Sequence, residues 1–279
     1  MIHVPPPLPR SPARSLYPTA DVRVRFLGTG TSHGIPVIGC ACPVCTSPHP
    51  HNRRLRSSIL IETGERRVVV DTTPEFRLQA LAAGLQTLDA VLFTHAHADH
   101  IFGLDDVRIF NWRTKQPMPI YGSPDTLATV RRSFGYVFED GPEGGGKPKL
   151  DVIPVTGPFE VAGLHVTPLE VLHGQLAVTA FRVRERPGGA EFAYATDCNY
   201  IAPETLAQLQ GLDLLILDAL GKNRHPTHFS LEQAIEVARE LAPRRTLFTH
   251  ISHGLEHEET NATLPDGMSL AHDGLVVEL

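Results

Sequence analysis

The stretch THAHADH at residues 94–100 directly follows the mostly apolar run LDAVLF. A run of this kind predicts a strand that is buried on both faces. His95, His97 and Asp99 are spaced by two and would share one face of an extended chain, whereas His100 breaks that register. One tetrahedral ion cannot easily take four donors from so short a segment and keep an open position. The pattern therefore favours two metal ions over one, and over a polar loop without metal.

Three later strand ends offer further metal ligands, namely His173, Asp197 and His250. Polar side chains at strand ends gather where loops form binding sites. Each residue also has an ordinary explanation, as an edge histidine, a helix N-cap and a turn residue respectively. Imidazole and carboxylate ligands suit zinc, manganese or iron, so the sequence leaves the identity of the metal open.

Three cysteines, Cys40, Cys42 and Cys45, have the spacing C-x-C-x2-C. This crowding does not suit a disulfide framework, and three thiolates suit a structural zinc ion that takes a fourth ligand from elsewhere. His253 is the candidate, and it would tie the N-terminal loop to the loop that bears His250. Buried free thiols are the alternative. Cys198 is interpreted as a small core residue, with an oxidation-sensitive role left open.

The composition is that of a soluble globular protein of 279 residues, of which 42% are hydrophobic and 20% charged. Fifteen histidines are the unusual feature and suggest that imidazole is used. No apolar run reaches the roughly eighteen residues of a membrane span, and the first residues lack the apolar core of a secretory signal, so a cytoplasmic location is expected. The formal net charge of -6 argues against a protein that mainly coats nucleic acid.

Short strand-like and helix-like runs alternate along the chain, which predicts an α/β fold. One domain is expected over residues 21–279, after a proline-rich extension at residues 1–20, and residues 139–149 form a glycine-rich loop. The tetrapeptide Leu-Phe-Thr-His occurs at 92–95 and again at 247–250, each time ending an apolar strand. Two similar halves would produce this echo, and so would coincidence.

The expected strands cover 22–27, 57–62, 67–71, 88–95, 150–155, 164–171, 177–184 and 191–196, and the runs LDLLILDA, RTLFTH and LVVEL. Helices are expected near Pro74, after the N-cap Ser123, from Pro203, and from the capping box SLEQ that opens at Ser230.

HAHADH followed by separate His, Asp and His positions resembles the ligand set of the metallo-β-lactamase superfamily. The resemblance implies a four-layer αββα sandwich with two mixed β-sheets, outer helices and a dinuclear site between the sheets. It implies that one metal is held by His95, His97 and His173, that the other is held by Asp99, His100 and His250, and that Asp197 bridges the two. All seven positions carry the expected residue type, which implies an active metal-dependent hydrolase.

GTGTSHGIPVIGCACPVC at 28–45 and THISHG at 249–254 resemble a narrower group, the PhnP-like phosphoribosyl cyclic phosphate phosphodiesterases. In that group the cysteines and the second histidine hold a structural zinc, and the reaction opens a five-membered cyclic phosphate. The resemblance implies two divalent catalytic ions, zinc or manganese, with a hydroxide between them as nucleophile. It assigns leaving-group protonation or phosphate stabilisation to His228, with Asp99 orienting the water. His225 is a weaker candidate, and its ordinary interpretation is an exposed loop histidine.

Basic residues follow the cysteine loop at Arg53, Arg54 and Arg56. Guanidinium groups bind phosphate in a bidentate manner, so these residues could meet the substrate, whereas a solvated charge run is the ordinary alternative. His33, in the first glycine-rich turn, could approach the site from one side.

Two other functions remain as alternatives, a ribonuclease Z-like tRNA 3′-processing endonuclease and a pyrroloquinoline quinone B-like cofactor-biosynthesis protein. The ribonuclease would need an RNA-binding arm, and the loop 139–149 is a poor one because its two lysines face three acidic residues. The quinone B-like proteins share the cysteine loop but depart from the dinuclear ligand set. The expected partner is a small phosphate-ester substrate. Nucleic acid is disfavoured, no membrane is expected, and a homodimer is left open.

Overall fold

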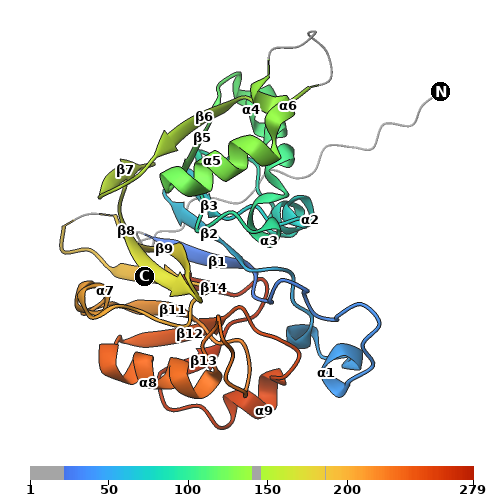
Figure 1. Ribbon diagram of the computed structural model, residues 1–279, viewed down its shortest axis with the longest axis vertical. Helices are drawn as coiled ribbons and strands as arrows, with labels where there is room; N and C mark the ends of the chain where they lie inside the picture. The colour runs from blue at the N-terminus through green and yellow to red at the C-terminus, as the bar shows by residue number, and fades with distance from the viewer. Residues whose placement is uncertain (1–21, 140–145, 186) are drawn as a thin grey trace, which may run out of the picture.

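The computed structural model describes residues 22–139, 146–185 and 187–279, which form two facing β-sheets with helices on their outer sides (Figure 1). Each sheet has seven strands. The first contains, in spatial order, β14 (Val276–Glu278), β1 (Arg23–Gly28), β2 (Ser58–Thr63), β3 (Arg66–Val70), β4 (Ala90–Leu92), β5 (Met118–Gly122) and β6 (Leu150–Pro154). The second contains β13 (Met268–Leu270), β12 (Arg245–Thr249), β11 (Leu214–Asp218), β10 (Glu191–Ala195), β9 (Leu176–Arg184), β8 (Leu164–His173) and β7 (Phe159–Val161).

The helical segments are short and lie between the strands in the chain. They are α1 (Pro43–Thr46), η1 (Pro50–Asn52), α2 (Phe76–Ala82), α3 (Ala98–Ile101), η2 (Leu104–Val107), α4 (Arg108–Thr114), α5 (Pro124–Ser133), α6 (Gly135–Phe138), α7 (Pro203–Gln208), α8 (Leu231–Leu241) and α9 (His257–Asn261). Among the described residues, none of these helices combines the length and the hydrophobicity that a membrane crossing requires.

Strand β11 shows why the apolar runs are buried on both faces. Its residues Leu214 and Ile216 belong to the core between the sheets. The alternate residues Leu215 and Leu217 belong to the outer core, which also contains Ala234 of α8. Side chains alternate across a strand, so an all-apolar strand can satisfy two cores only when a helix covers its outer face. The expected αββα architecture with two mixed sheets is confirmed.

The parallel parts of the two sheets place polar residues at the same kind of position. β3 and β4 pair in parallel in the first sheet, and β10, β11 and β12 do so in the second. Asp71 directly follows β3, Asp197 lies two residues after the end of β10, and His250 directly follows β12. The two Leu-Phe-Thr-His segments lie at the ends of parallel strands, one in each sheet, but β4 already ends at Leu92 whereas β12 continues to Thr249.

Most predicted elements are present, and so are the predicted N-cap at Ser123 and the predicted capping box at Ser230. Ser123 caps α5 through a bond from Thr126 N–H, and Ser230 and Gln233 form the reciprocal capping box of α8. Strand β5 was not expected, although it pairs with both β4 and β6. The proline-rich extension at 1–20 and most of the loop 139–149 lie outside the described residues.

The motif at residues 94–100 differs from the extended geometry that the spacing suggested. β4 already ends at Leu92, and α3 begins at Ala98 with His97 as its N-cap. Asp99 and His100 therefore lie in a helical turn and not in an extended strand. The turn is what points adjacent ligand-type side chains in different directions.

Gly103 fixes the link between α3 and η2. A Cβ atom at this position would lie 2.0 Å from the carbonyl oxygen of Thr73 and 2.6 Å from Cβ of Phe76, so the backbone would have to move. We expect Gly103→Ala to lower the free energy of unfolding by about 2–3 kcal/mol because overpacking strains both segments. Denaturant unfolding measures this loss. The matched control is Gly157→Ala, where no heavy atom lies within 4 Å of the added carbon, and an equal loss there would contradict the prediction.

Candidate metal centre

Three residues at the strand ends adopt a left-handed backbone conformation that is unusual for residues other than glycine. The φ angles are 65° for Asp71, 54° for Asp197 and 58° for His250. Such conformations cost of order 1–3 kcal/mol each and concentrate at functional sites. They turn the chain sharply after each buried strand and direct the polar side chains into the gap between the sheets.

One group of ligand atoms gathers around Asp197. The ligand atoms of Asp99, His100, Asp197 and His250 all lie within 4.8 Å of one another. Nε2 of His100 is 3.3 Å from Oδ2 of Asp197 and 3.3 Å from Oδ2 of Asp99. Nε2 of His250 is 3.1 Å from Oδ1 of Asp197. The two oxygens of Asp197 thus face different histidines, as a carboxylate shared between ligand groups would.

The buried histidine nitrogens of this group fit a metal ion. Nε2 of His100 and Nε2 of His250 are buried and have no hydrogen-bond partner, although buried polar atoms are nearly always paired. His100 Nδ1 is 2.7 Å from Oδ2 of Asp71, and when its N–H donates there, Nε2 keeps its lone pair. This is the arrangement in which a second carboxylate orients a metal-binding imidazole.

Opposite charges around Asp197 stabilise one another. Burial alone would raise the pKa of Asp197, but His250 and His100 outweigh burial and hold that pKa well below its usual range. Burial likewise opposes ionisation of His100, yet Asp197, Asp71 and Asp99 raise its pKa well above the usual value. The pocket therefore strongly favours positive charge between its carboxylates, which a divalent cation also supplies.

His95, His97 and His173 lie beside this group. Nε2 of His95 is 2.9 Å from Nδ1 of His97, and the ring centroids of His97 and His173 are 5.3 Å apart. Nδ1 of His95 is 3.0 Å from the Thr94 hydroxyl, which itself donates to Asp71. Nδ1–H of His95 therefore donates to Thr94, and the lone pair of Nε2 faces His97.

His173 completes this side with a defined tautomer. Its Nδ1 is 2.8 Å from the carbonyl oxygen of Thr227, which can only accept. Nε2 is therefore free to bind a cation. Burial lowers the pKa of His173, which favours the neutral imidazole. Its ligand atom lies within 4.8 Å of those of Asp197 and His228. The three histidines are thus adjacent, with His173 grouped most closely with Asp197 and His228.

His228 lies at the centre, whereas His225 lies at the surface. Nδ1 of His228 is 2.7 Å from Oδ2 of Asp218, and its ring stacks on His250 with centroids 4.6 Å apart. His225 is exposed, and its Nδ1 accepts a bond from Thr227 N–H. Its ring centroid is 5.2 Å from that of His228. The geometry favours His228 for contact with a reacting group.

Two carboxylates that orient the site were missed in the sequence. Asp71 holds His100 and Thr94, and Asp218 holds His228 and the backbone N–H of Cys198. Both directly end apolar strands, in VVVD and LLILD, which is the same signal that singled out Asp197. Nothing in the spacing distinguished a metal ligand from a residue that orients one. Cys198 itself is fully buried in the outer core.

The three cysteines and His253 form a second, separate group. Their ligand atoms lie within 4.8 Å of one another, and Nδ1 of His253 is 3.3 Å, 3.5 Å and 3.4 Å from the sulfurs of Cys40, Cys42 and Cys45. Backbone N–H groups of Val37 and Cys45 donate to the sulfurs of Cys45 and Cys42. Three sulfurs and one ring nitrogen in this arrangement suit a closed tetrahedral site.

The thiols of Cys42 and Cys45 differ in acidity. The backbone N–H of Cys45 lowers the pKa of the Cys42 thiol to about 6, whereas burial raises the pKa of Cys45 to about 11. A bound cation would stabilise the second thiolate.

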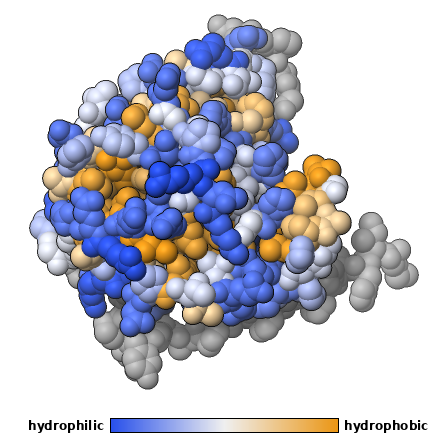
Figure 2. Space-filling view, turned by 60° about the horizontal axis from the view of Figure 1, so that its bottom comes forward, coloured by the Kyte–Doolittle hydropathy of each residue, from blue (hydrophilic) through white to orange (hydrophobic). Residues whose placement is uncertain are grey.

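The loop projects from the body near α1 (Figure 1), and hydrophobic side chains lie along the same side of the molecule in Figure 2. Ile38 of this loop is 99% exposed.

Two of the arginines after the cysteine loop, Arg54 and Arg56, contact other groups of the protein. Arg54 is only 2% exposed and donates to the Thr29 hydroxyl and the Ala271 carbonyl. It is therefore neither a solvated charge nor a group open to substrate. Arg56 pairs with Glu75. Arg53 is exposed, and so is His33.

Comparison with known proteins agrees with this geometry. Residues 66–251 match the model of the beta-lactamase superfamily domain. The crystal structure of a new diphosphatase from the PhnP family superposes with a TM-score of 0.85 and 40% identity, over 92% of this chain and 97% of that one. Zn(2+)-bound PqqB from Methylobacterium extorquens shares the fold, with a TM-score of 0.76, 22% identity, and coverage of 92% of this chain and 100% of that one.

A relative known by sequence is longer than this chain. The octanoyltransferase of Porphyromonas gingivalis is 38% identical over 259 residues, which cover 91% of this chain and 51% of the relative. This chain therefore spans about half the length of that protein. The family model covers more than half of the chain, and the diphosphatase matches over nearly its whole length. The chain thus belongs to the metallo-β-lactamase superfamily and, within it, to the PhnP family.

Proposed function

We propose that the protein is a metal-dependent phosphodiesterase that hydrolyses a small cyclic phosphate ester of the phosphoribosyl type. The observation that carries this proposal is the group around Asp197, where unpaired buried nitrogens of His100 and His250 face a shared carboxylate. The 40% identical PhnP-family diphosphatase supports phosphate ester or anhydride chemistry. The name of the octanoyltransferase relative offers no phosphate chemistry, and this chain spans only half of that protein.

The ligand set suits two divalent ions, zinc or manganese. Asp99, His100 and His250 would hold one ion and the three remaining histidines, His95, His97 and His173, the other, with Asp197 between them. When bound, such ions supply Lewis acidity and a lowered pKa for water. His95 is fully buried, whereas His97 is exposed, so the site opens to substrate on the His97 side.

His228 is suited to the leaving-group oxygen. Asp218 accepts from Nδ1 of His228, which fixes the orientation of the ring, while Nε2 points away from Asp218. A proton on Nε2 can then be given to the departing alkoxide. Asp218 is fully buried and is also held by the backbone N–H of Cys198, so the ring has little freedom to turn.

The two alternative functions have weaker support. A ribonuclease Z of Bradyrhizobium is 29% identical but aligns with only 57% of this chain, and human tRNase Z shares the fold at 19% identity. Coenzyme PQQ synthesis protein B of Methylorubrum extorquens is 25% identical over 92% of this chain. The small phosphate ester remains the preferred substrate, and nucleic acid the less favoured one.

A side-by-side assay tests the substrate class. Purified protein loaded with zinc or manganese should hydrolyse bis(p-nitrophenyl) phosphate, and should prefer a ribose cyclic phosphate to 2′,3′-cyclic nucleotides, a diphosphate ester and precursor tRNA. Preference for precursor tRNA would overturn the proposal, and preference for the diphosphate ester would move the substrate to an anhydride.

The number of bound metals is a separate expectation. Elemental analysis of the loaded protein should find about three ions per chain, two in the His/Asp group and one in the cysteine group, because both donor sets are complete. A value near one would contradict the paired site. Mild chelation should remove the His/Asp ions first, since four thiolate and imidazole ligands close around the third.

A further inference from the structure

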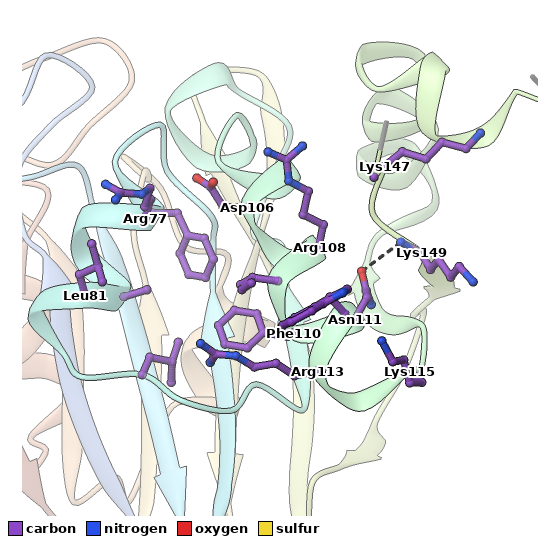
Figure 3. Close-up of a pocket in the computed structure, with 16 residues that line it drawn as sticks. Arg77, Leu81, Asp106, Arg108, Phe110, Asn111, Arg113, Lys115, Lys147 and Lys149 are labelled. Carbon is purple, nitrogen blue, oxygen red and sulfur yellow. Dashed lines mark hydrogen bonds between the residues drawn. The ribbon is translucent and has the colours of Figure 1, made fainter. Parts of the chain in front are cut away.

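A cavity far from the metal ligands lies on the outer side of the first sheet. Its volume is about 790 Å³, and it is bordered by α2, by η2 and α4, and by residues 146–149 (Figure 3). None of the residues that line it belongs to the His/Asp group or to the cysteine group. A volume of this size is typical of pockets that hold small organic molecules.

The inner surface of the cavity is apolar and combines aromatic and aliphatic side chains. Phe76 and Phe110 are almost fully buried beneath it. Leu81 and Trp112, by contrast, are 64% and 68% exposed at its wall, and Ile109 is also exposed. Large apolar side chains left in water beside a concave surface indicate a binding site.

The rim of the cavity is strongly basic in a chain of net charge -6. Among the described residues that line it, six are basic and one is acidic, Asp106; the basic ones are Arg77, Arg108, Arg113, Lys115, Lys147 and Lys149. Figure 3 shows the labelled basic side chains arranged around the apolar centre, from α2, α4 and the segment before β6.

The basic groups differ in how far they are already used. Arg108 pairs with Asp105 at 3.0 Å, Arg113 donates to the carbonyl of Gln86, and Lys147 donates to two carbonyls. Within the part of the chain that the structure describes, Arg77 and Lys149 have no ion pair within 4 Å, although the charge of Arg77 acts on the nearby carboxylate of Asp106. An excess of cations around a hollow attracts an anionic ligand.

We propose that this cavity binds an amphipathic organic anion, with its hydrocarbon chain against Leu81 and Ile109 and its anionic head held by basic side chains of the rim. The apolar lining accounts for the chain, and the excess of cations over the single carboxylate accounts for the head. Single-stranded nucleic acid fits less well, because such sites present several exposed aromatic rings for stacking, and Trp112 is the one exposed aromatic residue among the described lining residues.

The chain carries its own reporter for this test. It contains one tryptophan, which is Trp112 in the wall of the cavity, with Lys115 Nζ 5.1 Å from its ring centre. The probe is octanesulfonate, which has the chain and the charge but cannot be hydrolysed as a phosphate ester. We expect a saturable change in tryptophan emission. Octyltrimethylammonium should bind at least about tenfold more weakly, and methanesulfonate should give no change.

Variants locate the head group and the chain. Arg77→Gln combined with Lys149→Gln should weaken octanesulfonate binding about tenfold or more, and Leu81→Asn should weaken it with the cations intact. Arg244→Gln is the matched control, because Arg244 is an exposed arginine just before β12, far along the chain from the cavity residues, and pairs with Asp213. Titration calorimetry checks the same series independently of fluorescence. Circular dichroism checks that each variant is folded.

Three results would overturn the proposal. They are equal binding of the anionic and the cationic probes, equal weakening in Arg244→Gln, and displacement of octanesulfonate by an oligouridylate that binds more tightly. The last result would assign the surface to nucleic acid. Phosphodiesterase turnover is not part of the readout, so failure of the cavity proposal and failure of the proposed function are distinguishable.

Discussion

Replacing Asp197 with asparagine is expected to lower phosphodiester turnover about a thousandfold, equivalent to about 4 kcal/mol of transition-state stabilisation. Asp197 contacts His250 at 3.1 Å and His100 at 3.3 Å. Its carboxylate lies within 4.8 Å of the ligand atoms of Asp99, His100 and His250, and also within 4.8 Å of those of His173 and His228. Asparagine keeps the size of the side chain but removes the negative charge. The affinity of both metal positions should therefore fall together.

The measurement combines turnover of bis(p-nitrophenyl) phosphate with metal analysis of the same sample. Asp151→Asn is the matched control, since Asp151 is an exposed carboxylate on β6, and it should keep full turnover. If Asp197→Asn keeps its full metal content and more than half of the wild-type turnover, a bridging role for Asp197 is excluded.

Asp99→Ala separates the ligand group from the rest of the site. Asp99 is only partly buried and lies at the first turn of α3, so its removal should abolish activity while the far-ultraviolet circular dichroism stays unchanged. Its carboxylate contacts His100 Nε2 and no strand depends on it. Retained turnover in this variant would refute a mechanism that needs both metals.

The ligand-type residues could be found from the sequence because they recur at one kind of position. Asp197 and His250 each lie at the end of an apolar strand, and buried apolar runs can be recognised from the order of residues in the sequence. The motif at 94–100 added four donors in one segment. What the local sequence could not show was that α3 begins at Ala98, because a helix of one turn leaves no periodic pattern.

The supporting residues and the basic cavity were not predictable, for physical reasons that differ. Asp71 and Asp218 carry the same sequence signal as the ligands, and only the distances to His100 and His228 reveal their roles. Arg54 belongs to a run of arginines that looked solvated, yet contacts with Thr29 and Ala271 from distant segments bury it. The cavity combines α2, α4 and residues 146–149, whose proximity depends on the whole first sheet.

The cysteine group is expected to stabilise the region between two distant loops. Cys45→Ser should remove one of the three metal ions and lower the free energy of unfolding by on the order of 3 kcal/mol, the scale of losing a structural metal. For a chain of this size that corresponds to a melting temperature lower by about 6–12 °C. Calorimetry and metal analysis measure both quantities. Cys198→Ala is the matched control and should keep all three ions, because Cys198 is buried away from the group.

The same substitution should also reduce turnover, although Cys40, Cys42 and Cys45 do not belong to the His/Asp group. His253 lies three residues beyond His250, and the intervening Ile251 bridges to Gly30 in the N-terminal loop. An ion held by Cys45 and His253 would therefore limit the motion of His250, whose Nε2 lies close to Asp197. If Cys45→Ser lost its third ion yet kept full turnover and an unchanged melting temperature, the coupling between the two sites would be excluded.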